Sequence, residues 1–246
     1  MRTALRGVPA RAVLLTVPAY LLAILSRHLT GRLLGGETGG APPSPLPGVV
    51  SYTMLIVFSL LLFALVDGRP WRRFGFHKPD GPWLRFIVYA LAVGTVVTFT
   101  LKLTPGKGMS EALKGVSPAL LLPIIIYGST AEEFFTRGWF QSFLEPERGR
   151  LVRLGRFAAS LPVVASGILF GAMHLTLLLR GADPWTIGFV LVFTTTVGLL
   201  AATVRELTGS LWPAILTHLA GNAGGVLGGI LYAAAYTARH GRPPAM

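Results

Sequence analysis

Seven stretches of the chain are apolar and within a turn or two of the length that crosses a membrane, and they limit its fold more than any other feature. A helix needs about 20 apolar residues to span the hydrocarbon core, and about 17 to 25 are tolerated. The stretches are approximately Val8–Ser26, Val49–Val66, Phe86–Leu101, Ala119–Phe143, Phe157–Leu179, Trp185–Val204 and Leu211–Tyr236. They predict an all-α, polytopic bundle of about seven membrane-spanning helices.

The composition agrees with this interpretation. Charged residues make up 13% of the chain and the mean hydropathy is +0.62, whereas a soluble domain carries about a quarter charged residues. No cysteine is present, which excludes disulfides, zinc–thiolate sites and a thiol nucleophile. We expect residues 1–246 to form a single integral membrane domain, with scaffold helices in 1–105 and the functional helices in 117–236.

The net charge of +12 is distributed as the positive-inside rule predicts. With a cytoplasmic N-terminus, thirteen basic residues fall in inner segments and eight in outer ones. The basic start of the chain has no cleavage signal after its apolar stretch, so we expect a retained first helix. The pattern favours a multi-pass protein of the cell (cytoplasmic) membrane that contacts anionic lipids, and no nucleic acid partner is expected.

The loop between the second and third stretches, "DGRPWRRFGFHKPDGPW", mixes arginines with aromatic residues. Aromatic side chains often lie at the membrane surface among lipid headgroups. We therefore expect an interfacial anchor formed by Trp71, Phe74, Phe76 and Trp83.

Few ionisable residues lie inside the apolar stretches. Of ten acidic residues only Glu132 and Glu133 do so, and of five histidines only His174 and His218. Charged groups at bilayer depth are costly and persist mainly where they face the interior of a bundle and have a function there. These four side chains therefore form one candidate site.

Helical spacing extends this site, because residues four apart share a face of a helix. Glu133 and Arg137 can form an ion pair, Phe170 lies one turn from His174, and Asn222 lies one turn from His218. Glu132 points about 100° away from Glu133. We expect Glu133 to be structural and Glu132 to be free to act as a base.

These groups have the chemistry of acyl-bond hydrolysis. A carboxylate and an imidazole can hold and deprotonate a water molecule. An imidazole and a side-chain amide can stabilise a tetrahedral oxyanion. The small residues around the histidines let helices approach closely.

The segments "EEFFTRG", "FGAMH" and "GSLWPAILTHLAGN" resemble the EExxxR, FxxxH and HxxxN blocks of the CPBP family, the CAAX proteases and bacteriocin-processing enzymes also called Abi. The resemblance covers roughly residues 132–222. It implies a glutamate-dependent intramembrane endopeptidase, in which Glu132 and His174 activate water and His218 and Asn222 form the oxyanion hole. Glu133 and Arg137 would orient the site, with Phe170 beside it, and the substrate would be a membrane-associated peptide or a lipidated protein.

The sequence departs from the family at Thr136, where an aromatic residue is frequent, and this bears on local packing. No HExxH or GxSxG motif is present, and the three aspartates lie outside the apolar stretches, which disfavours the corresponding protease classes. No cofactor is expected. Zinc held by Glu132, His174 and His218 is a minor alternative.

Two other functions remain open. The same buried glutamates and histidines suit a proton-coupled transporter or a non-proteolytic membrane scaffold. A transporter favours two halves of similar pattern, whereas the polar groups here occupy only the back half. A scaffold would tolerate loss of Glu132.

Simple counting places His174 towards the outer end of its stretch, away from Glu132 and His218. We expect Pro162, or a shifted boundary of that stretch, to bring His174 within about two helical turns of Glu132 in height.

Overall fold

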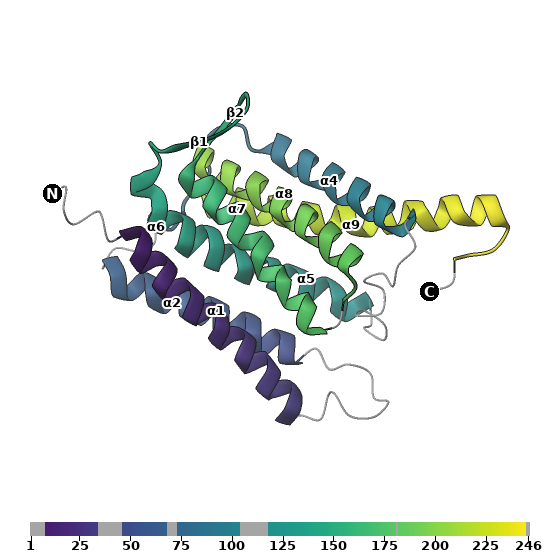
Figure 1. The fold of residues 1–246 in the computed structure, drawn as a ribbon, viewed down its shortest axis with the longest axis horizontal. Coiled ribbons are helices and arrows are strands. Elements are labelled where there is room, and N and C mark those ends of the chain that lie inside the picture. Colours follow the sequence, from purple (N-terminus) through teal and green to yellow (C-terminus); the bar gives the residue numbers. More distant parts are fainter. Residues whose placement is uncertain (1–7, 34–45, 68–72, 104–117, 181, 245–246) are drawn as a thin grey trace.

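The chain folds into a bundle of long helices with one small β-hairpin (Figure 1). The computed structural model describes residues 8–33, 46–67, 73–103, 118–180 and 182–244. The elements are α1 (Val8–Leu33), α2 (Leu46–Asp67), α4 (Leu84–Leu103), α5 (Pro118–Glu133), the π-helix η2 (Phe134–Gln141), α6 (Ser142–Leu144), the 3₁₀ turn η3 (Glu145–Glu147), β1 (Leu151–Leu154), β2 (Phe157–Ser160), α7 (Leu161–Met173), the 3₁₀ segment η4 (His174–Arg180), α8 (Pro184–Thr208) and α9 (Leu211–His240). The predicted all-α fold is confirmed.

Within the described residues, five helices are long and apolar enough to cross a membrane. They are Leu46–Ala64, Leu84–Leu103, Leu161–Leu178, Pro184–Thr208 and Leu211–His240. The chain is therefore a multi-pass membrane protein. The other two predicted spans correspond to α1, whose apolar part is the shorter segment Thr16–Ser26, and to the composite of α5, η2 and α6. The total of seven spans stays a prediction.

The predicted start of the fifth stretch at Phe157 is wrong. Phe157–Ser160 is a β-strand, paired antiparallel with β1 so that Leu154 lies opposite Phe157. A short apolar run suits a strand as well as a helix, so hydropathy alone does not separate them. The helix starts at Leu161, where the Ser160 side chain accepts a hydrogen bond from the Val163 amide and Pro162 occupies the first turn, a position that favours proline.

The helices pack in pairs, α1 with α2, α7 with α8 and α4 with α9, and α5 packs between α2 and α9 (Figure 1). Glycines bring α4 and α9 into backbone contact. A Cβ at Gly94 would meet the carbonyl oxygen of Gly221, and one at Gly224 would meet that of Leu91. Small residues are the usual means of close helix approach in membranes, and here they fix the helix that carries His218 and Asn222.

An aromatic cluster fills the core beside η2. Trp139 is fully buried, lies 4.9 Å from Phe143 between ring centroids, and donates from its indole nitrogen to the Thr16 hydroxyl at 3.1 Å. Phe74 is 1% exposed and stacks on Phe63 at 3.8 Å. The interpretation of Phe74 as an interfacial anchor is therefore wrong, because its ring packs inside the protein. Trp71 lies outside the described residues.

Candidate active site

The two adjacent glutamates stand at a change of helix type. Glu132 and Glu133 end α5, and the π-helix η2 begins at the next residue, Phe134. Segments of π-helix are rare and occur frequently at functional sites. This unusual backbone therefore coincides with the residues that the sequence singles out.

The predicted ion pair between Glu133 and Arg137 is present. Arg137 Nη1 lies 2.8 Å from Glu133 Oε1, and both side chains are fully buried. Arg137 also donates to Thr136 Oγ1 at 2.6 Å and to the carbonyl oxygen of Gly198 on α8 at 2.8 Å. Its guanidinium lies 4.5 Å from the centroid of the Phe170 ring. Arg137 thus ties η2 to α7 and α8 and neutralises Glu133.

Thr136 takes part in the same network. Its hydroxyl donates to the carbonyl oxygen of Glu132 at 2.6 Å and accepts from Arg137. Thr136, which stands where an aromatic residue is frequent, therefore contacts both the backbone of Glu132 and the guanidinium of Arg137.

His218 lies between the two carboxylates. Its Nδ1 is 3.0 Å from Glu133 Oε1, and its Nε2 is 3.8 Å from Glu132 Oε2. A carboxylate only accepts hydrogen bonds, so Nδ1 carries the proton of this contact. The side chain of Glu132 is 17% exposed, whereas that of Glu133 is fully buried. The two carboxylates, which are neighbours in sequence, therefore have different environments.

His174 reaches this cluster through Phe170. The Phe170 ring lies edge to face with both imidazoles, 5.1 Å from His174 and 4.9 Å from His218 between centroids. His174 Nδ1 is 2.9 Å from the carbonyl oxygen of Phe170. That carbonyl can only accept, which leaves the lone pair of Nε2 available in the neutral ring. The ring nitrogen paired with Glu132 belongs to His218 and not to His174.

Asn222 lies one turn beyond His218 on α9 and donates from Nδ2 to Ser129 Oγ at 2.9 Å. Ser129 is 3% exposed. Sequence reasoning missed this residue. The available signal was spacing, since Ser129 precedes Glu133 by four positions and so lies on the same face of α5.

The described residues contain no cluster of three or more histidine, aspartate or glutamate side chains arranged to hold a metal ion. The metal alternative therefore rests on the chemistry of Glu132, His174 and His218 alone.

The site lies within a recognisable family segment. Residues 114–224 match a family model described as type II CAAX prenyl endopeptidase Rce1-like. Comparisons with curated proteins and with solved structures found no match. The matched segment extends over η2 and α7 into the half of α9 that carries His218 and Asn222. Residues 114–224 are thus similar to Rce1-like type II CAAX prenyl endopeptidases, and the predicted resemblance is confirmed over this segment.

Proposed function

We propose that the protein is an intramembrane endopeptidase that hydrolyses a peptide bond in a membrane-associated substrate by water activated at Glu132. The observation that carries this proposal is the position of His218. Its Nδ1 is bonded to Glu133 and its Nε2 faces Glu132. A charged cluster at bilayer depth is expensive unless it has a function, and its place in an Rce1-like segment favours peptide hydrolysis.

Glu132 is the general base in this proposal. It is the more exposed of the two carboxylates, so a substrate can reach it. The carboxylate takes a proton from water as the oxygen adds to the carbonyl carbon, and it returns that proton to the leaving amine when the C–N bond breaks. The lone pair on Nε2 of His174 supplies a second acceptor for the same water.

His218 and Asn222 stabilise the oxyanion. A protonated His218, flanked by two carboxylates, donates from Nε2 to the developing negative charge. Asn222 donates one of its two amide hydrogens to Ser129 Oγ, and its second amide hydrogen can donate to the oxyanion. Removal of one such donor costs about 10²–10³ in kcat in a well-studied protease, so each residue is expected to matter for turnover.

Glu133 and Arg137 are positioning residues. Glu133 holds the His218 ring through Nδ1, and Arg137 holds Glu133. This arrangement fixes the tautomer and orientation of the imidazole, much as a buried carboxylate does in catalytic triads.

For the substrate, we propose a prenylated C-terminal peptide of CAAX type, since the family description names a prenyl endopeptidase. Membrane lipids are the other expected partners, and the cytoplasmic membrane is the proposed location. No cofactor is required by this mechanism, and zinc stays the minor alternative.

The test is cleavage of a quenched fluorogenic peptide panel, with and without a C-terminal prenyl-cysteine, by purified protein in detergent. Glu132→Gln is compared with Glu147→Gln, which makes the same change in the 3₁₀ turn η3, where Glu147 pairs with the exposed Arg150. We expect Glu132→Gln to lose activity and Glu147→Gln to keep it, with no effect of a chelator.

Three other results would favour a different mechanism or function. Activity abolished by a chelator and restored by zinc would support the metal alternative. Activity that survives in Glu132→Gln would contradict the mechanism. No cleavage of any peptide by folded protein would favour the scaffold or transporter.

A further inference from the structure

Among the residues that the structure describes, four buried side chains each hold a polar atom that has no hydrogen-bond partner. Within the part of the chain that the structure describes, these atoms are Glu133 Oε2, Arg137 Nε, Gln141 Oε1 and Arg205 Nε. Each residue is at most 8% exposed. Unpaired polar atoms in a protein interior are rare and costly, and each needs an explanation.

The four residues lie along one line, here called the polar seam. On successive turns of η2, Arg137 donates to the carbonyl oxygen of Gly198 and Gln141 to that of Ala202, each at 2.8 Å. These two carbonyls are also one turn apart on α8. Arg205, on the next turn of α8, donates to Ser142 Oγ at 3.1 Å. The polar seam therefore follows the contact between η2 and α8, starting at Glu133.

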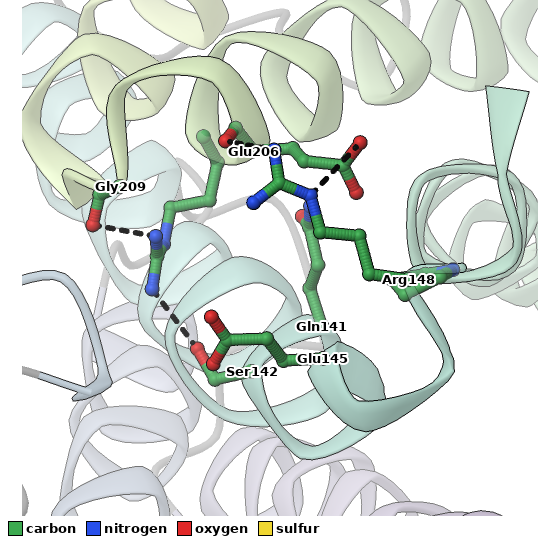
Figure 2. A pocket seen from close by; sticks show the side chains of 8 residues that line it. Gln141, Ser142, Glu145, Arg148, Glu206 and Gly209 are labelled. Carbon is green, nitrogen blue, oxygen red and sulfur yellow. Dashed lines mark hydrogen bonds and ion pairs between the residues drawn. The ribbon is translucent and has the colours of Figure 1, made fainter.

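The polar seam ends in a small pocket (Figure 2). The pocket is lined in part by Ser142 of α6, which lies at the end of the bundle that bears the hairpin (Figure 1). The pocket has about 60 Å³ of room for water-sized groups and is lined by Gln141, Ser142, Glu145, Arg148, Pro162, Arg205, Glu206 and Gly209. Figure 2 shows Gln141 between Ser142 and the pair formed by Arg148 and Glu206. The side chain of Arg148 is 56% exposed, so the pocket meets solvent at its rim.

The donors and acceptors among the unpaired atoms indicate that their hydrogen-bond partner is water. In order along the polar seam they are an acceptor on Glu133, a donor on Arg137, an acceptor on Gln141 and a donor on Arg205. Water both donates and accepts, and a buried water typically makes about three hydrogen bonds to such groups. An ion fits less well, because two guanidinium groups and two carboxylates line the pocket together.

We propose that the polar seam is a water path that carries the hydrolytic water from the pocket to the carboxylates of the candidate site. This inference rests on the proposed function, since hydrolysis consumes one water for each peptide bond cleaved. The inner end of the path is Glu133 Oε2, next in sequence to the proposed base Glu132. In this proposal Glu133 Oε2, which has no partner among the described residues, accepts a hydrogen bond from the innermost water of the path.

The first test replaces Gln141 by leucine, which has similar size and no polar atom. We expect kcat to fall about tenfold, equal to about 1.4 kcal/mol in the barrier, with KM unchanged because Gln141 is buried, at 5% exposure. Gln141→Met is a second apolar variant of similar length. Ser166→Ala is the matched control, because it also removes a side-chain hydrogen bond to a carbonyl of η2, that of Thr136, but lies off the polar seam.

The second test detects water without relying on activity. X-ray radiolysis in H₂¹⁸O labels aromatic rings beside bound water even where bulk solvent cannot reach them. Phe170 is 1% exposed and lies against Arg137, whereas the equally buried Phe63 packs among aromatic rings. We expect ¹⁸O on Phe170 and not on Phe63, and a loss of the Phe170 label in Gln141→Leu.

The outcomes separate the two proposals. An unchanged kcat or an unchanged Phe170 label in the folded Gln141 variants overturns the water path, while cleavage by the wild-type protein leaves the proposed function standing. If the wild-type protein cleaves no peptide but the Phe170 label depends on Gln141, the seam is hydrated and the proposed function fails instead.

Discussion

At the scale of single residues, the adjacent glutamates have different tasks because their surroundings differ. Glu133 is fully buried and contacts Arg137 and His218, whereas Glu132 is partly exposed and faces Nε2 of His218. Loss of one partner of a buried ion pair leaves the other charge uncompensated. Stability should therefore depend on Glu133 and turnover on Glu132.

We predict that Glu133→Gln lowers the free energy of unfolding by about 3–5 kcal/mol, as is typical when one partner of a buried ion pair is removed. Glu132→Gln should leave stability nearly unchanged while it abolishes cleavage. Thermal unfolding in detergent, measured beside peptide cleavage, checks both. Equal destabilisation by the two variants would show that the carboxylates share one role.

Ser129 is predicted to position Asn222. Ser129→Ala removes the acceptor for one amide hydrogen, so kcat should fall by about fivefold, roughly 1 kcal/mol, in the range of one ordinary hydrogen bond. The fall should vanish in an Asn222→Ala background, because residues that share a contact are not additive. Ser59→Ala serves as control, since that buried serine bonds the Leu55 carbonyl of its own helix. Full additivity of Ser129→Ala and Asn222→Ala would reject the positioning role.

Sequence spacing predicts some of these contacts and not others. The pair Glu133–Arg137 follows from an interval of four on one helix. The contact between His218 and Glu133 joins positions 85 apart, and that between Asn222 and Ser129 joins positions 93 apart. Such contacts depend on how α9 packs against α5, which helical periodicity within a single segment does not encode.

At the scale of elements, the contact between α4 and α9 fixes the helix that holds His218 and Asn222. We predict that Gly94→Ala destabilises the protein by about 1–3 kcal/mol, the usual cost of overpacking, because its Cβ would meet the Gly221 carbonyl. Gly229→Ala is the matched control on α9, where a Cβ meets no atom of the described residues within 4 Å. The measurement is thermal unfolding of both variants. A Gly94→Ala protein as stable as the control would contradict this close contact.

Element boundaries were predictable where the chain carries clear turn signals. α9 begins at Leu211 as expected, two residues after Gly209, which adopts a positive φ of 66° and ends α8. The hairpin and η2 were not predictable in this way. Phe157, Ala158 and Ala159 are as apolar as a membrane span, and nothing in the hydropathy of "FFTRGWFQ" distinguishes a π-helix from an α-helix.

At the scale of the whole molecule, seven crossings would put the two ends of the chain on opposite sides of the membrane. The native chain has no cysteine, so single cysteines report topology cleanly. We predict that a membrane-impermeant maleimide labels Arg242→Cys in intact cells and labels Gly149→Cys only after lysis. Both positions are exposed. Labelling of both cysteines from the same side would contradict seven crossings with a cytoplasmic N-terminus.

The central claim is that water held by Glu132 attacks the peptide bond. Its most direct test is a single turnover in H₂¹⁸O, with mass analysis of the new C-terminal carboxylate and of Glu132. The mechanism predicts one ¹⁸O in the product and none in Glu132, with no product from Glu132→Gln. An ¹⁸O atom in the Glu132 carboxylate, with ¹⁶O in the product, would show instead that Glu132 bonds covalently to the substrate.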